Sequence, residues 1–524
     1  MSLEGQLSRG AGPAPSAGGA WRWALAPALG YLAAAAIVLA LGFEAVSDDD
    51  YARALIAQRF ARAPRLDPSG SSWLPFPFWV MGALMRAFGP SLAVARASAL
   101  GWAAASGLLL WAAGRRAGLS PAAAALGALA PLTAPAIAPL AAAHVPELPT
   151  AALATYGVAT ACGGRGRALV GGGLALAAAC LSRYEAWPLA LYAALALGAR
   201  ARHERARGPA AIAASLAVAG PLAWLGWNHL AHGDALWFAR RVAFYHANVA
   251  RPPGAVAGAL GGYPLALVRE APGLVLAAFV VLLAGREARR RWGLPLGAGL
   301  ALLVALSAAE ARGGAPTHHP ERALLACWCL LGVAVAGEGA RWLGAAAGGR
   351  SAERQGPGAT GATEATGAPG KTSATGATGA TGGVRAAREW GAAALVASVT
   401  VAGFAWRARA MADEVGPARA DELALGRALA GRVEPGERVL LAPPSYAHLA
   451  AIAAFGRPDD VIARLPRAVD PRSTAPDPFA DEASLARAIE GAGARWLLAT
   501  GEQRRVAEAS GLRGGPLVGS WWLY

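Results

Sequence analysis

The chain has 524 residues, of which 55% are hydrophobic and only 15% are charged. This composition excludes an ordinary soluble enzyme, and the apolar residues gather into stretches of about 17 to 24, the length that crosses ~30 Å of hydrocarbon as a helix. The formal net charge of +15 is almost entirely arginine, because Lys371 is the only lysine. Arginine between apolar stretches sets orientation in a membrane. We therefore expect a polytopic α-helical membrane protein with membrane lipids, and no nucleic acid, as partners.

The apolar pattern predicts about eleven transmembrane helices. Residues 1–20 are predicted as a flexible cytoplasmic N-terminus, 21–345 as the main transmembrane domain and 388–410 as the last helix. The predicted spans are 22–43, 91–113, 119–140, 147–163, 167–182, 186–199, 208–227, 262–284, 293–310, 321–345 and 388–408.

The arginines between the predicted spans fall on one side of the membrane. They are Arg115, Arg116, Arg165, Arg167, Arg200, Arg202, Arg205, Arg207, Arg286, Arg289, Arg290, Arg291, Arg341 and Arg350. By the positive-inside rule this side is the cytoplasm, and an odd number of crossings places the C-terminal region in the periplasm or the extracellular space. We expect a multi-pass protein of the inner (plasma) membrane.

Three segments depart from the apolar pattern. The first outer loop, 44–90, contains arginines and the segment WLPFPFW, and it predicts one or two amphipathic helices on the outer surface. Residues 346–387, mostly Gly, Ala and Thr, predict a flexible cytoplasmic linker. Residues 413–524 alternate helical patterns with strands at Arg438–Leu441, Arg495–Leu498 and Ser520–Leu523. They predict a small extracytoplasmic α/β domain.

Polar clusters gather on the predicted outer face. They are Asp48, Asp49 and Asp50; His144 and Glu147; Arg183, Tyr184 and Glu185; Asn228, His229 and His232; and His318, His319, Glu321 and Arg322. Each has a structural alternative: helix capping for the acids, an ion pair for Arg183 with Glu185, and surface-loop positions for the histidines. Transporters place polar groups near the bilayer midplane. Groups gathered at one boundary favour an enzyme acting on a lipid-bound substrate. A flippase for lipid-linked sugars and a membrane scaffold are the alternatives.

The order of these motifs resembles that of a known family. A long first helix, SDDDY at Ser47–Tyr51, the WLPFPFW element, HVPE at His144–Glu147, SRYEAWP and a later HHPER turn are similar to membrane glycosyltransferases of the GT-C fold. Within them the chain is most similar to bacterial relatives of protein O-mannosyltransferases and of the lipid A aminoarabinose transferase. The resemblance covers about residues 20–410 in layout. Family members carry two acids near the start of the first outer loop, whereas this chain has three.

The resemblance implies transfer of a sugar from a polyprenyl-phosphate donor to a hydroxyl of a lipid, glycan or protein acceptor, with inversion. The leaving phosphate needs cationic stabilisation, which arginine supplies, and the attacking hydroxyl needs a carboxylate base. Among Asp48, Asp49 and Asp50, we expect Asp48 or Asp49 to be that base. The substrate-binding candidates are His144, Glu147, Arg183, Tyr184, Glu185, His318, His319 and Arg322. No cofactor or metal site is expected, although the resemblance leaves open a divalent cation held by Glu147 and the aspartates.

Overall fold

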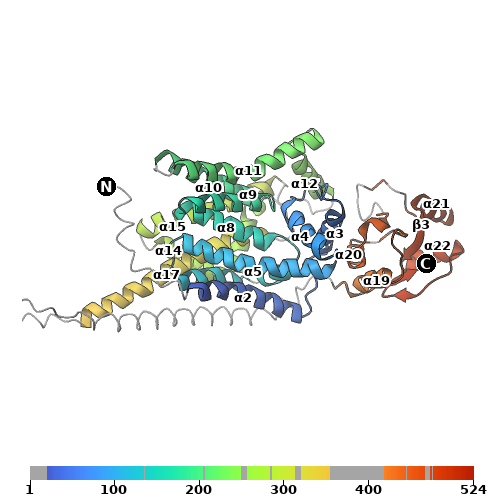
Figure 1. Ribbon diagram of the computed structural model, residues 1–524, viewed down its shortest axis with the longest axis horizontal. Coiled ribbons are helices and arrows are strands. Elements are labelled where there is room, and N and C mark those ends of the chain that lie inside the picture. Colours follow the sequence, from blue (N-terminus) through green and yellow to red (C-terminus); the bar gives the residue numbers. More distant parts are fainter. Residues whose placement is uncertain are drawn as a thin grey trace, which may run out of the picture.

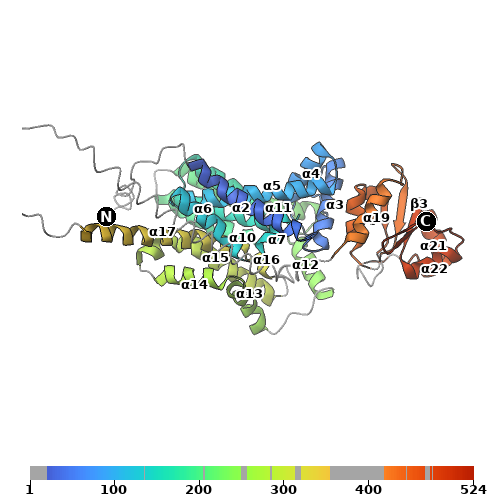
Figure 2. The same cartoon turned by 90° about the horizontal axis from the view of Figure 1, so that it is seen from below.

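The computed structural model describes residues 20–134, 136–203, 207–248, 256–283, 286–312, 320–354, 418–443, 445–465, 473–474 and 476–524. Helices α2 to α17 form a helical body, and the C-terminal domain lies at one end of it (Figures 1 and 2). We call this end the domain-facing end. The predicted last span, 388–408, and most of the predicted linker lie outside the described residues.

The helical body begins with α2, which is followed by two helices at the domain-facing end, α3 and α4 (Figure 1). The bounds of the first eight elements are α2 Ala20–Ala40, α3 Asp48–Arg62, α4 Phe76–Phe88, α5 Leu92–Arg116, α6 Pro121–Leu129, the 3-10 helix η3 Ala130–Thr133, α7 Ile137–Ala142 and α8 Glu147–Gly163. The others are α9 Arg167–Cys180, α10 Ala186–His203, α11 Arg207–His232, α12 Trp237–Asn248, α13 Val256–Glu270, α14 Pro272–Leu283, α15 Arg286–Ala311, α16 Pro320–Ala323 and α17 Leu325–Arg354.

Three predicted spans are broken rather than continuous. The span 321–345 falls on α16 and α17, which are separated at Leu324. Residues 119–140 form α6, η3 and α7, with Pro131 near the start of η3. Residues 262–284 form α13 and α14, which meet at an angle of 101° beside Pro272. Proline lacks a backbone N–H and clashes with the preceding turn, so a continuous apolar pattern does not guarantee a continuous helix. Proline is tolerated at a helix start, and the WLPFPFW element accordingly begins α4 with Pro77 in its first turn.

Four of the described helices are long and apolar enough to cross a membrane alone: α2, α5, α11 and α15. A fifth span is added if the bent pair α13 and α14 counts as one. Shorter apolar helices among the described residues include α4 with 13 residues and α9 with 14. The protein is a helical membrane protein, and the total of about eleven crossings stays a prediction.

Small residues allow the helices to pack closely. A Cβ atom on Gly107 of α5 would lie 2.7 Å from the carbonyl oxygen of Pro27 in α2. In α9, a Cβ atom on Gly173 would lie 2.7 Å from the carbonyl oxygen of Ala213 in α11. A Cβ atom on Gly220 of α11 would lie equally close, 2.7 Å, to the carbonyl oxygen of Ala177 in α9. Helices in a membrane associate largely through such close backbone contacts, because lipid provides no hydrophobic drive between them.

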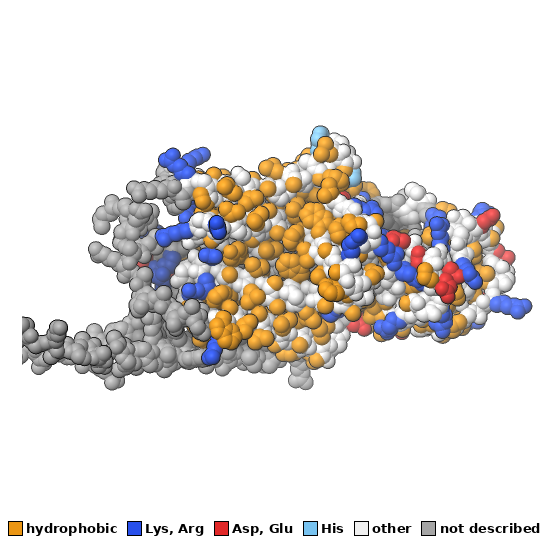
Figure 3. All heavy atoms as spheres, in the orientation of Figure 1, with side chains coloured by type: hydrophobic (Ala, Val, Ile, Leu, Met, Phe, Trp, Pro, Cys, Tyr) orange, Lys and Arg blue, Asp and Glu red, His pale blue; other side chains and the backbone are white. Residues whose placement is uncertain are grey.

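The surface of the helical body divides into two zones. Hydrophobic side chains cover its middle, and arginines gather at the end away from the C-terminal domain (Figure 3). Large aliphatic side chains in the interior of the long helices are strongly exposed, for example Leu222 of α11 at 61% and Leu300 of α15 at 61%. An apolar belt of this kind is stable in lipid and unfavourable in water.

The C-terminal domain is a small α/β unit with a five-stranded sheet in the order β2-β1-β3-β5-β4. Strand β1 pairs in parallel with β2 and β3, whereas β5 runs antiparallel to β3 and β4. The strands are β1 Arg438–Leu441, β2 Val461–Ala463, β3 Ala494–Ala499, β4 Leu517–Val518 and β5 Trp521–Leu523. The helices are α19 Ala420–Ala430, α20 His448–Phe455, η4 Pro458–Asp460, α21 Glu482–Ala492 and α22 Gly501–Ala509.

The domain shares a hydrophobic core with the outer-loop helices. Tyr51 and Leu55 of α3 and Met85 of α4 belong to the same buried cluster as Leu425 of α19 and Ala450 of α20. The Gln58 side-chain amide also donates to the carbonyl of Ala453 at 2.8 Å. Helix α3 is therefore packed between the helical body and the C-terminal domain.

Candidate functional site

Asp50 is an architectural residue at the start of α3. Its side chain is fully buried and accepts hydrogen bonds from the backbone N–H groups of Val46 at 3.0 Å and Ser47 at 3.4 Å. Its other oxygen accepts from the backbone N–H of His144 at 2.5 Å. Burial raises the pKa of Asp50, and the hydrogen bond from His144 opposes that rise. Asp50 thus caps α3 and ties it to the loop before α8.

The other two aspartates differ from Asp50 and from each other. Asp48 is paired with Arg419, whose Nε and Nη2 atoms lie 2.9 and 3.0 Å from its two carboxylate oxygens. Asp49 is exposed, and no residue of the described chain makes a hydrogen bond or ion pair with its carboxylate. Of the three acids in SDDDY, only Asp49 therefore presents an open carboxylate.

Glu147 anchors a cluster of buried charges at the first turn of α8. Its Oε1 atom accepts from Arg183 Nη1 at 2.8 Å and from Arg322 Nε at 2.9 Å and Nη2 at 2.5 Å. The Glu147 side chain is buried, and its Oε2 atom has no hydrogen-bond partner among the described residues. One carboxylate thus holds two guanidinium groups that come from different parts of the chain.

Arg183 lies in the turn between α9 and α10, where it also contacts Glu185. Its Nε and Nη2 atoms approach Glu185 Oε1 at 3.1 and 2.5 Å. Burial alone would lower the pKa of Arg183, but the charges of Glu147, Glu185 and, more weakly, Asp49 outweigh it and raise the pKa. The Asp49 carboxylate is therefore within electrostatic reach of this cluster.

Arg53 is a site residue that the sequence analysis did not single out. It follows Asp49 by one helical turn on α3, and its side chain is buried with Cζ 4.5 Å from the ring centroid of Trp73. Burial lowers the pKa of Arg53, while the charges of Glu147 and Asp49 act in the opposite direction. The signal in the sequence was the i, i+4 spacing of Asp49 and Arg53, which places both on one face of α3.

The remaining predicted residues have separate positions. The Tyr184 hydroxyl donates to the carbonyl of Ser72 at 2.7 Å, and its ring stacks on Phe238 at 4.7 Å, so Tyr184 packs against the outer loop. His144 is buried, and burial lowers its pKa to about 3, which keeps the ring neutral at neutral pH. His318 and His319 lie outside the described residues.

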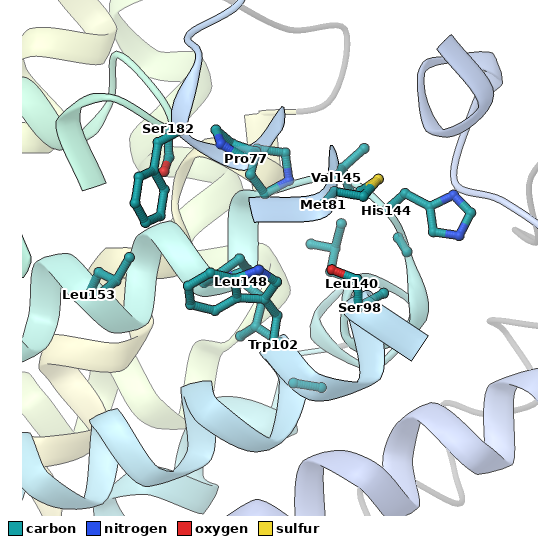
Figure 4. A pocket seen from close by; sticks show the side chains of 16 residues that line it. Pro77, Met81, Ser98, Trp102, Leu140, His144, Val145, Leu148, Leu153 and Ser182 are labelled. Atoms are coloured by element: carbon teal, nitrogen blue, oxygen red, sulfur yellow. The ribbon is translucent and has the colours of Figure 1, made fainter. Parts of the chain in front are cut away.

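An apolar pocket lies beside the charged cluster. Its cavity volume is about 30 Å³, room for only a few water-sized groups, and its lining includes Phe76, Trp102, Leu148 and Leu153. Figure 4 shows that the His144 ring points away from Trp102 and Leu148. The pocket is lined mainly by hydrophobic side chains and is small.

The described residues contain no cluster of three or more His, Cys, Asp or Glu side chains that could hold a metal ion. Glu147 is already engaged by Arg183 and Arg322, and Asp48 by Arg419. Two of the residues expected to share a divalent cation, Glu147 and Asp48, are therefore already paired with guanidinium groups.

The fold of the chain is similar to solved structures of ArnT, and the resemblance found in the sequence is confirmed at the level of the fold alone. One similar structure is ArnT from Cupriavidus metallidurans bound to undecaprenyl phosphate, with 14% identity and a TM-score of 0.56 over 97% of this chain and 98% of that chain. The apo state of the same protein has 14% identity and a TM-score of 0.54 over 93% of this chain and 96% of that chain. No known protein family model and no curated protein sequence matches the chain.

Proposed function

We propose that the protein is a glycosyltransferase that transfers a sugar from a polyprenyl-phosphate donor to an acceptor hydroxyl at the outer face of the inner membrane. The observation that carries this proposal is the open carboxylate of Asp49, which lies one helical turn before the buried Arg53 on α3 and whose charge also acts on the buried Arg183. A base next to cations is the combination that an inverting transfer from a lipid phosphate requires.

The proposed reaction is a single displacement. The acceptor oxygen attacks the anomeric carbon and loses its proton to Asp49, while the bond from that carbon to the phosphate oxygen breaks. The polyprenyl phosphate leaves with the bonding electrons, and the guanidinium groups of the cluster stabilise its added negative charge. Glu147 holds Arg183 and Arg322 in place.

The charge distribution favours an enzyme over a flippase. A flippase path should place charged groups along helices between the two leaflets. In the part of the chain that the structure describes, Asp49, Arg53, Glu147 and Arg183 instead gather at the domain-facing end of the helical body.

The class of donor can be tested with purified protein in proteoliposomes that are supplied with undecaprenyl-phosphate-linked sugars. The measured quantity is the release of undecaprenyl phosphate. The Arg183→Lys variant keeps the charge but loses the planar fork that holds phosphate, so we expect its KM for the donor to rise about 10-fold. Arg240→Lys is the matched control, because Arg240 on α12 is 77% exposed and pairs with Asp234 at the surface. Equal donor KM values for both variants and the wild type would remove Arg183 from the phosphate site. No release from any donor by wild-type protein would contradict the proposed function.

The proposal also requires the domain-facing end to be extracytoplasmic. We infer this side from the arginines at the opposite end of the helical body (Figure 3). A reporter that is active only outside the cytoplasm should therefore be active when fused after Tyr524 and inactive when fused before Trp21. The reverse pattern would place the charged cluster in the cytoplasm and contradict the proposed location.

A further inference from the structure

Arg419 joins the C-terminal domain to the first turn of α3. It lies directly before α19, and its guanidinium group donates hydrogen bonds to both carboxylate oxygens of Asp48, at 2.9 and 3.0 Å. Its backbone N–H donates to Glu44 Oε2 at 2.7 Å. The side chains of Arg419 and Asp48 are 19% and 24% exposed. Two contacts from one residue therefore fix the segment that leads into α3.

We propose that Arg419 is a positioning residue that orients the first turn of α3 and thereby the Asp49 carboxylate, so that the C-terminal domain takes part in sugar transfer through this contact. The inference rests on the proposed function, in which Asp49 is the base. It assigns a role to a residue more than 350 positions away from Asp49 in the chain.

The first reason is electrostatic. Asp48, Asp49 and Asp50 place three acids in one helical turn, and like charges at this spacing repel one another. The hydrogen bond to Asp48 raises the pKa of Arg419, so the guanidinium stays charged and compensates Asp48. Asp50 is held by backbone N–H groups. Asp49 is then the acid of the turn that remains open for a substrate.

The second reason is geometric. In addition to the shared core and the Gln58 contact, arginine side chains join the domain and α3 at two separated places. Near the far end of the helix, Arg62 Nη2 donates to the carbonyl of Gly456 at 3.0 Å, and Nη1 lies 3.3 Å from an Asp459 oxygen. Arg419 acts at the start of the helix, one residue from Asp49. Arg62 therefore docks the same domain without touching the turn that carries the base, which makes it a matched control.

The test compares Arg419→Ala, Arg419→Lys and Arg62→Ala in the full-length protein. For Arg419→Ala we expect kcat to fall about 10-fold while the donor KM stays within about 2-fold, because a misplaced base affects the chemical step more than donor binding. Arg419→Lys keeps a charge near Asp48 and should restore part of the lost kcat. Arg62→Ala should retain the wild-type kcat, because its contacts are exposed and lie at the other end of α3.

Hydrogen exchange gives a readout that does not depend on activity. Backbone amides of the first two turns of α3 should exchange faster in Arg419→Ala than in the wild type, and at the wild-type rate in Arg62→Ala. Unchanged exchange in Arg419→Ala, or an equal loss of kcat in both alanine variants, would overturn the positioning role. Absence of sugar transfer by the wild type would instead refute the proposed function, and the exchange rates would still decide whether Arg419 holds the turn.

Discussion

Replacing Asp49 with asparagine should lower sugar-transfer turnover by about 10² to 10⁴, because the acceptor hydroxyl loses the group that takes its proton. Folding should be unaffected, since the Asp49 carboxylate is exposed and makes no hydrogen bond or ion pair within the described chain. The measurement is single-turnover transfer in proteoliposomes, together with binding of undecaprenyl phosphate, which we expect to be retained.

Asp48→Asn is the control for this experiment. The Asp48 carboxylate is already bound by Arg419. Loss of its charge should therefore act only through the position of the turn and reduce turnover far less than Asp49→Asn. Asp49→Asn with wild-type turnover would show that Asp49 is not the base. A larger loss from Asp48→Asn than from Asp49→Asn would assign that role to Asp48.

Replacing Glu147 with glutamine should destabilise the protein by about 3–5 kcal/mol, because it removes the counter-charge of buried guanidinium groups. Arg183 and Arg322 both bind Glu147 Oε1, and the Glu147 side chain is buried. The expected result is a large drop in the thermal midpoint in detergent and a low yield of folded protein.

Glu287→Gln is the matched control for Glu147→Gln. Glu287 also pairs with an arginine, Arg291, but its side chain is 89% exposed. A pair whose carboxylate is solvent-exposed contributes about 0–1 kcal/mol, and Arg291 keeps its second partner Glu338, so the thermal midpoint should hardly change. If both glutamine variants had the same thermal midpoint as the wild type, Glu147 would not be the anchor of the cluster.

Within the described residues, the sequence predicted most helix positions to within a few residues, because apolar length is a local signal. It failed where a helix breaks within an apolar stretch. Residues 119–140 contain Pro131 and Pro139, and the structure divides them into α6, η3 and α7. Hydropathy measures transfer into lipid and does not respond to the loss of one backbone hydrogen bond.

The roles of the three aspartates could not be separated from the sequence. Their environments differ only through partners far along the chain: Asp50 bonds to His144, 94 residues away, and Asp48 to Arg419, 371 residues away. Arg53 was seen only as surface charge on an amphipathic helix, because nothing near it in the sequence shows that Trp73 covers its guanidinium group. Local patterns therefore found the turn that carries the acids but not the division of roles within it.

The shared core between α3, α4 and the C-terminal domain has a consequence for how this protein diverges from its relatives. Leu55 and Met85 on one side and Leu425 and Ala450 on the other bury the same apolar surface. A change of side-chain volume on one side leaves a void or an overlap unless the other side changes with it. The domain is therefore not a separable module: grafting it from a relative would require its partner loop to be grafted as well, and the two segments are expected to accept substitutions in pairs.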